Sequence, residues 1–352
     1  MSLNWAEQLF SVIEDAARAH PRSWSLGVAR NGGALRIVHL SAGSESFQEM
    51  DRCLAVAPPA PGRQSLTVFS CTSEVLQEIA PTVRLADGLH RPAGSITDLD
   101  PNRWRWRTDM NRKVVYGLDL EGLRGLTVVA EAPDDSELSA PFRTHFQWLA
   151  QQRGEALIHA AMVVRAQSGV LIVGPGGAGK STTVCSALLA GLGTLGDDYV
   201  WVQPPGATGG TFTARSVYQT VKLRPSGPAA NHPAVQGLGH RSVREGQKRL
   251  HYLSPEQSVD PQQSVDISAI VVLSRGLGEG PPRQVSGSAA LVAAAPSTAL
   301  QGADDQQQTL AVISAMARSI PTYQVPLVAS AELQGQLVEQ VIARSAGALM
   351  HV

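Results

Sequence analysis

Apolar positions near the start of the chain recur first at helical spacing and then at strand spacing. Between residues 4 and 19 they return every three or four positions, which predicts an amphipathic helix. Short apolar runs bounded by turn residues come next, and such runs are typical of strands. We expect these strands at 25–28, 35–40, 65–70, 104–116 (as an antiparallel pair) and 126–129. The pattern predicts a small α+β domain over residues 1–133, in which we recognise no catalytic motif.

A polar break at residues 131–136 separates this region from a second pattern, in which helices and strands alternate. We expect a helix at 139–153, strands at 156–164 and 170–173, a helix at 181–190 and a strand at 194–202. Alternation of this kind is typical of α/β proteins. The sequence therefore predicts a second, α/β domain over residues 137–352.

The junction between the apolar strand at 170–173 and the next helix carries a glycine-rich motif, GPGGAGKS. Its spacing, G-x-x-x-x-G-K-[ST], and its position between a strand and a helix predict a phosphate-binding loop. Backbone N–H groups of such a loop and the helix N-terminus attract phosphate. Lys180 would reach the β- and γ-phosphates of ATP, and the Ser181 hydroxyl would ligate Mg²⁺. The expected nucleotide-binding residues are Gly174, Pro175, Gly176, Gly177, Ala178, Gly179, Lys180, Ser181 and Thr182.

The composition, and the absence of certain motifs, argue against several classes of protein that contain such a loop. The net charge is −1, so no global field attracts nucleic acid or an anionic membrane. No run of 18 apolar residues occurs, and acids interrupt the apolar positions of the first 20 residues, which argues against a membrane span and a signal peptide. We expect a cytoplasmic protein that binds neither nucleic acid nor membrane. The absence of LSGGQ-like, DxxG and NKxD segments after the loop argues against an ABC ATPase and a GTPase switch.

An acidic pair, Asp197 and Asp198, begins sixteen residues after Ser181 in the strand expected at 194–202. Adjacent strand residues point to opposite faces, so the two carboxylates are expected to do different work. One would hold magnesium, directly or through water, and the other would face an acceptor. The sequence leaves open which aspartate has which role.

These motifs, in this order, resemble the bacterial HPr serine kinase/phosphorylase family. The resemblance rests on Ile158-His159-Ala160, the glycine loop and Gly196-Asp197-Asp198, and it covers about residues 137–345. Four further stretches resemble HPr-kinase-related proteins of bacterial biosynthetic clusters, some of which phosphorylate a serine of a lasso-peptide precursor. These stretches are 217–225, 248–252, 295–298 and 320–323. The signature loop of the family, an acid before Arg-Gly-Leu-Gly, has only a weak echo at 236–239, and we interpret Arg275-Gly276-Leu277-Gly278 as a turn.

The resemblance implies a P-loop fold with a mixed sheet, shared with ATP-dependent phosphoenolpyruvate carboxykinase, and a kinase that uses ATP and Mg²⁺. It implies that one aspartate takes the acceptor's proton and that the other, here assigned as Asp197 with Ser181, lies near the metal. His159 matches the histidine near the phosphates. Candidates for neutralising phosphate or acceptor charge are Lys222, Arg224, Lys248 and Arg249.

The acceptor stays open at this point. A serine of a peptide or protein is the first expectation, and a small-metabolite hydroxyl is the alternative. A nucleotide-dependent hydrolase and a nucleotide sensor without phosphotransfer are the other two classes that the loop allows. Residues 1–133 would contribute acceptor recognition or assembly, and a homo-oligomer is left open.

Overall fold

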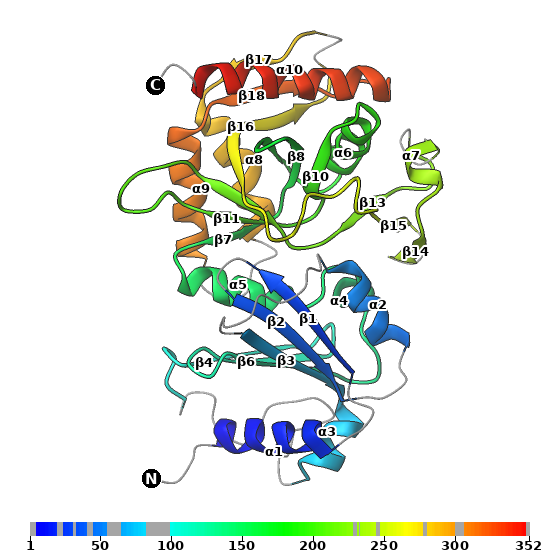
Figure 1. Ribbon diagram of the computed structural model, residues 1–352, viewed down its shortest axis with the longest axis vertical. Coiled ribbons are helices and arrows are strands. Elements are labelled where there is room, and N and C mark those ends of the chain that lie inside the picture. The colour runs from blue at the N-terminus through cyan, green and yellow to red at the C-terminus, as the bar shows by residue number, and fades with distance from the viewer. Residues whose placement is uncertain are drawn as a thin grey trace. The chain divides into compact units, whose positions relative to one another are not determined.

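The computed structural model of the 352-residue chain divides into two compact units. One unit comprises Met1–Arg52 with Val56–Leu149, and the other comprises Cys53–Ala55 with Ala150–Val352. The residues described are 5–19, 24–30, 33–40, 45–54, 65–81, 99–227, 231, 233–243, 247–276, 280–299 and 306–349. Elements of both units are drawn in Figure 1.

A mixed sheet organises the first unit. Its described strands are β1 (Trp24–Arg30), β2 (Gly33–His39), β3 (Ser65–Thr72), β4 (Trp104–Asp109), β5 (Val114–Asp119) and β6 (Arg124–Val129). They lie in the order β1-β2-β3-β6-β5-β4, with β2, β3 and β6 parallel and the outer pairs antiparallel. The helices are α1 (Trp5–Ala19), α2 (Glu45–Cys53), α3 (Ser73–Ile79), α4 (Asp135–Ser139) and α5 (Arg143–Gln152).

The periodic patterns in this unit are confirmed as elements. The helix expected at 4–19 is α1, which buries Leu9, Phe10 and Ile13 against the sheet, and each expected strand is present. Trp104 packs in the same core and stacks on Phe10, with ring centroids 5.9 Å apart. These aromatic side chains therefore form part of the core of an α+β unit.

The unit boundary lies after Leu149, later than the break at residues 131–136 suggests. Side chains of the two intervening helices, α4 and α5, form polar contacts with residues of the first unit. Glu137 of α4 pairs with Arg112 at 2.7 Å, and His145 Nε2 of α5 lies 3.0 Å from the Gly117 carbonyl oxygen. Because Glu137 and His145 are buried in these contacts, α4 and the part of α5 up to Leu149 belong to the first unit, although the polar break precedes them.

The second unit is an α/β structure built on a mixed sheet. Its described strands are β7 (Ala156–Ile158), β8 (Ala161–Arg165), β9 (Ser168–Val173), β10 (Gly193–Gly196), β11 (Val200–Gln203), β12 (Thr213–Ser216), β13 (Thr220–Leu223), β14 (His240–Val243), β15 (Lys248–Tyr252), β16 (Val265–Ser274), β17 (Arg283–Val285) and β18 (Thr322–Pro326). Its helices are α6 (Lys180–Leu189), α7 (Pro233–Gln236), α8 (Gly287–Ala299), α9 (Gln307–Ser319) and α10 (Ala331–Leu349).

The main sheet of this unit has the order β10-β8-β9-β16-β12-β11-β7, and β18 pairs with β16 beside β17. Its centre is parallel, because β16 runs parallel to both β9 and β18, and its other pairs are antiparallel. Strands β13, β15 and β14 form a separate antiparallel sheet.

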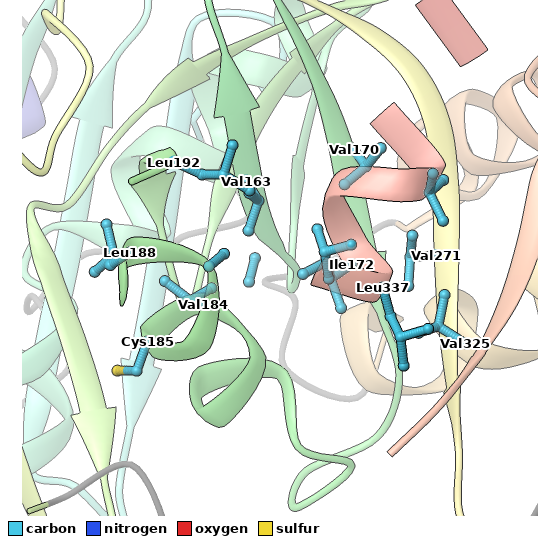
Figure 2. Close-up of a cluster of buried hydrophobic side chains, with 14 of the residues drawn as sticks. Val163, Val170, Ile172, Val184, Cys185, Leu188, Leu192, Val271, Val325 and Leu337 are labelled. Atoms are coloured by element: carbon cyan, nitrogen blue, oxygen red, sulfur yellow. The ribbon is translucent and has the colours of Figure 1, made fainter. Parts of the chain in front are cut away.

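Helices cover both faces of the main sheet, as the alternation of apolar side chains along β9 requires. Val170 and Ile172 belong to the core with α6 and α10, whereas Leu171 and Val173 belong to the core with α8 and α9. Figure 2 shows the first of these cores, to which α6 contributes Val184 and Leu188. A strand buried on both faces is held firmly, so the loop that follows β9 starts from a fixed point.

Two strands expected as continuous are each broken in the structure. The run 156–164 divides into β7 and β8 at His159, and the run 194–202 divides into β10 and β11 at the aspartate pair. Gly196, with φ +118°, takes a conformation that favours glycine, and the Thr194 hydroxyl accepts from its N–H at 3.0 Å. Asp197 and Asp198 therefore lie in a bend, so strand alternation does not explain their orientation. No helix among the described residues is long and apolar enough to cross a membrane.

Gly335 of α10 permits a close approach to α6, which begins at the glycine loop. A Cβ at this position would lie 2.5 Å from the Ser186 carbonyl oxygen, a backbone atom of α6. Ala in place of Gly gains about 1 kcal/mol of helix propensity, but overpacking costs about 1–3 kcal/mol. We expect Gly335→Ala to lower the midpoint of thermal unfolding, measured by circular dichroism. Gln336→Ala, at the exposed neighbouring position, should not lower it. An unchanged midpoint for Gly335→Ala would show that α10 moves away from α6 without cost.

Candidate functional site

The glycine loop joins the end of β9 to the start of α6, as its motif predicts. Gly177 and Gly179 have φ of +83° and +104°, which only glycine adopts without strain. Gly179 is also the N-cap of α6, and a Cβ there would lie 2.8 Å from Leu327. The loop therefore curls tightly onto a helix N-terminus, where free backbone N–H groups and the helix dipole favour an anion.

Lys180, the first residue of α6, folds back over the loop. Its Nζ donates to the carbonyl oxygens of Gly174 at 2.8 Å and Pro175 at 3.3 Å. The side chain is buried, and burial lowers the pKa of Lys180, while the charges of Asp197 and Asp198 act in the opposite direction. Its ammonium group is thus held against the loop by neutral carbonyls, with two carboxyl groups near enough to influence it.

His159 and the aspartate pair lie close together because the strands before and after each of them have different pairing partners. Strand β7 pairs with β11, whereas β8 pairs with β10. Each chain segment therefore moves to a different part of the sheet at its break, between β7 and β8 at His159 and between β10 and β11 at the aspartates. Because the two breaks are aligned, His159 Nε2 lies 3.3 Å from Asp198 Oδ1.

Asp197 is buried and faces the helix that follows the loop. Its Oδ2 accepts from the backbone N–H of Lys222 at 3.0 Å. Its Oδ1 is buried without a partner of full hydrogen-bond geometry among the described residues, although the nearby Ser181 hydroxyl lowers the carboxyl pKa. Burial is the largest influence and the charge of Asp198 is the next, and together they raise the pKa of Asp197 above its usual value. A cation at Oδ1 would relieve both costs.

Asp198 has a different environment, although it is the next residue. Its Oδ2 forms an ion pair with Lys222 Nζ, and its Oδ1 faces His159. Burial alone would raise its pKa, but Lys222 and His159 together hold the pKa of Asp198 well below its usual range. The carboxyl is therefore ionised at neutral pH, and its side chain stays 22% exposed. This is an ionised acceptor of hydrogen bonds that a second molecule can reach.

A cavity of about 690 Å³ contains the loop, His159 and both aspartates. Of the residues expected at the site, those that line it are His159, Gly176, Gly177, Ala178, Gly179, Lys180, Ser181, Thr182, Asp197, Asp198, Lys222, Arg224 and Lys248. Gly174 and Pro175 contribute to it only through the carbonyls that hold Lys180. Arg249 is exposed and is not among the lining residues, because it alternates with Lys248 along β15.

Arg275 also lines this cavity, although the sequence suggested only a turn. Arg275 and Gly276 do lie in a bend after β16, while Leu277 and Gly278 fall outside the described residues. Arg275 Nη2 donates to the Gly177 carbonyl oxygen at 2.7 Å. The available signal was the pair of apolar strands at 170–173 and 270–273, because the carboxyl ends of parallel neighbours meet at the same sheet edge.

Comparisons with known proteins leave the family open. No family model matches the chain, and no curated protein matches it by sequence. Among solved structures it is similar to a chain described as the Hpr(Ser) kinase/phosphatase from Coxiella burnetii, with 14% identity and a TM-score of 0.31. That match covers 54% of this chain and 99% of the other.

Proposed function

We propose that the protein is an ATP-dependent kinase that transfers the γ-phosphoryl group of Mg·ATP to a hydroxyl, in the first place a serine of a peptide or protein. The observation that carries the proposal is that one cavity contains a glycine loop on a helix N-terminus and, facing it, an ionised aspartate paired with a lysine and a histidine. Phosphoryl transfer needs few groups beyond these, because its catalysis is mainly positioning and electrostatic stabilisation.

The triphosphate would lie in the glycine loop. Free N–H groups of the loop and of the first turn of α6 bind the phosphate oxygens, and Lys180 exchanges the carbonyls of Gly174 and Pro175 for the β- and γ-phosphates. The lowered pKa of Lys180 supports this assignment, because a buried ammonium gains from an anionic partner that carbonyls do not supply.

Magnesium would lie between Ser181 and Asp197. Asp197 Oδ1 is buried, and among the described residues it has no partner of full hydrogen-bond geometry. This oxygen and the neighbouring hydroxyl of Ser181 are donors of the kind that Mg²⁺ prefers. The ion typically uses one or two carboxylates together with substrate phosphates and water, so this small donor set fits it. The metal supplies charge neutralisation across the phosphates when bound.

Asp198 would receive the acceptor. Its ionised carboxylate accepts a hydrogen bond from the acceptor hydroxyl and takes the proton as the oxygen forms its bond to the γ-phosphorus. The bond from the γ-phosphorus to the β,γ-bridging oxygen breaks, and ADP leaves with that electron pair. A carboxylate of low pKa orients the hydroxyl more than it deprotonates it early, which suits a loose transition state. His159 and Lys222 hold this carboxylate in place.

The acceptor class rests on the sequence resemblance over residues 137–345. The cavity does not limit the size of the acceptor, because part of its lining, including Arg224 and Arg275, is exposed. The first unit is proposed to recognise the acceptor or to support assembly.

Binding of Mg·ATP should stabilise the protein against heat. At a nucleotide concentration one hundred times Kd, linkage predicts about 2.7 kcal/mol of added stability. The measurement is a thermal melt with and without Mg·ATP, followed by a labelled-phosphate screen of serine peptides and small hydroxyl metabolites. A melting temperature that no nucleotide shifts would contradict the proposal. Turnover that water alone sustains equally well would indicate a hydrolase, and binding without turnover would indicate a sensor.

A further inference from the structure

Arg275 is a cationic residue that lines the cavity and has no role in the steps described above. It follows β16, which lies parallel to β9 with Val272 opposite Val173, so it leaves the sheet beside the start of the glycine loop. Its Nη2 donates to the Gly177 carbonyl oxygen at 2.7 Å, which fixes one edge of the guanidinium on the middle of the loop. The side chain is exposed and lines the same cavity as Lys180 and Ser181.

A guanidinium has five N–H donors, and the contact to Gly177 uses one of them. Arg275 forms no ion pair with a carboxylate among the described residues. The two acids of the cavity are already engaged, since Asp198 pairs with Lys222 and Asp197 lies near Ser181 and Lys180. An arginine that is anchored at one edge and has donors left over is arranged to bind an anion beside the loop.

We propose that Arg275 is a catalytic residue for the phosphoryl transfer, and this rests on the proposed function. Anchored to Gly177, it presents its remaining N–H donors to the oxygens of the γ-phosphoryl group. The bond from the γ-phosphorus to the β,γ-bridging oxygen breaks while the acceptor oxygen binds to the γ-phosphorus. Arg275, which is already in position, stabilises the negative charge on the oxygens of the γ-phosphoryl group during this step. A preorganised donor of this kind acts on the transition state more than on the bound nucleotide.

The test compares Arg275→Ala with Arg344→Ala. Arg344 is a matched control, because it also donates to a backbone carbonyl, that of Pro282 at 2.9 Å, and does not line the cavity. Two quantities are measured on the full chain. The first is kcat for ATP turnover with water as the acceptor, followed by release of labelled phosphate. The second is the affinity for Mg·ADP with and without aluminium fluoride, which mimics the transferring phosphoryl group.

We expect Arg275→Ala to lower kcat by about 100-fold or more, as loss of one preorganised donor does. Its Mg·ADP affinity should stay within about threefold of wild type, while the tightening by aluminium fluoride is lost. Arg275→Lys should restore a part of kcat, because it keeps the charge without the planar fork. Arg344→Ala should resemble wild type in both measurements.

Equal losses of Mg·ADP and Mg·ADP–aluminium fluoride affinity in Arg275→Ala would overturn the proposal, because they would show that Arg275 only braces the loop. So would turnover within about threefold of wild type. In both cases the wild-type protein still binds Mg·ATP, and the proposed kinase function is unaffected, because the acceptor screen tests it separately. A wild type that fails to bind Mg·ATP would overturn both.

Discussion

Lys180→Ala is expected to abolish measurable transfer and to weaken Mg·ATP binding, while the protein stays folded. The ammonium group donates hydrogen bonds to the carbonyl oxygens of Gly174 and Pro175 in the glycine loop, which is proposed to bind the phosphates. Removal of one preorganised donor costs about 100-fold to 1,000-fold in kcat, and loss of a phosphate contact adds a loss of affinity. The measurements are kcat and KM for ATP turnover, together with the thermal shift that Mg·ATP produces.

The fold should tolerate this change for a physical reason. The lowered pKa of Lys180 shows that its burial opposes the charged form, so Ala removes a destabilising charge together with its two hydrogen bonds. Lys113→Ala is the control, because Lys113 is exposed in the first unit and does not line the cavity. If Lys180→Ala retained turnover and the thermal shift, the loop would not be a phosphate-binding site.

The loop could be predicted from sequence because its determinants are local. An apolar strand, glycines at fixed offsets and a helix start are contained within about twenty residues, and the structure has each of them where the motif indicated. The helix expected at 4–19 was predictable for the same reason, since its apolar face is a property of its own spacing.

The breaks at His159 and at the aspartate pair could not be predicted in this way. The sequence predicts one continuous strand for each of these segments, because apolar residues lie on both sides of each break. They divide because β7 pairs with β11 while β8 pairs with β10, and these pairings join segments about thirty to forty-five residues apart. The different roles expected for Asp197 and Asp198 came from strand alternation, which does not apply in a bend. Their environments nevertheless differ, because one carboxyl faces Ser181 and the other faces Lys222 and His159.

The basic residues expected to neutralise phosphate or acceptor charge also depend on strand pairing that the sequence does not show. Lys222 and Lys248 line the cavity, whereas Arg249 does not, and the sequence alone did not show which face of β15 lies toward the cavity. Their positions depend on the separate sheet of β13, β15 and β14, whose register places Leu223 opposite Arg249. Arg275 was interpreted as part of a turn, because its approach to Gly177 results from the parallel pairing of β16 with β9, about one hundred residues earlier.

Asp198→Asn is expected to lower kcat for transfer by about 100-fold or more, with affinity for Mg·ADP retained. Asn keeps the shape of the side chain but cannot take the proton of the acceptor hydroxyl, and general-base groups contribute about 100-fold to 10,000-fold. Asp260→Asn is the control, at an exposed aspartate of the same unit that is not in the cavity lining. Asp197→Asn should differ from both, because its loss should raise the Mg²⁺ concentration needed for half-maximal turnover.

The same substitution should leave a signature in stability that a solvated aspartate would not. Because the folded pKa of Asp198 lies below its unfolded value, its charge stabilises the fold above the unfolded pKa, and this contribution is lost as pH falls through the folded pKa. Asp198→Asn also leaves Lys222, which is buried, without its charged partner, at a cost of roughly 1–3 kcal/mol. Unfolding by urea at neutral pH should therefore show Asp198→Asn less stable than wild type, with the difference shrinking at pH well below 3.8. Equal stability at neutral pH, together with unchanged kcat, would show that Asp198 is a solvated end of a strand and that the proton acceptor lies elsewhere.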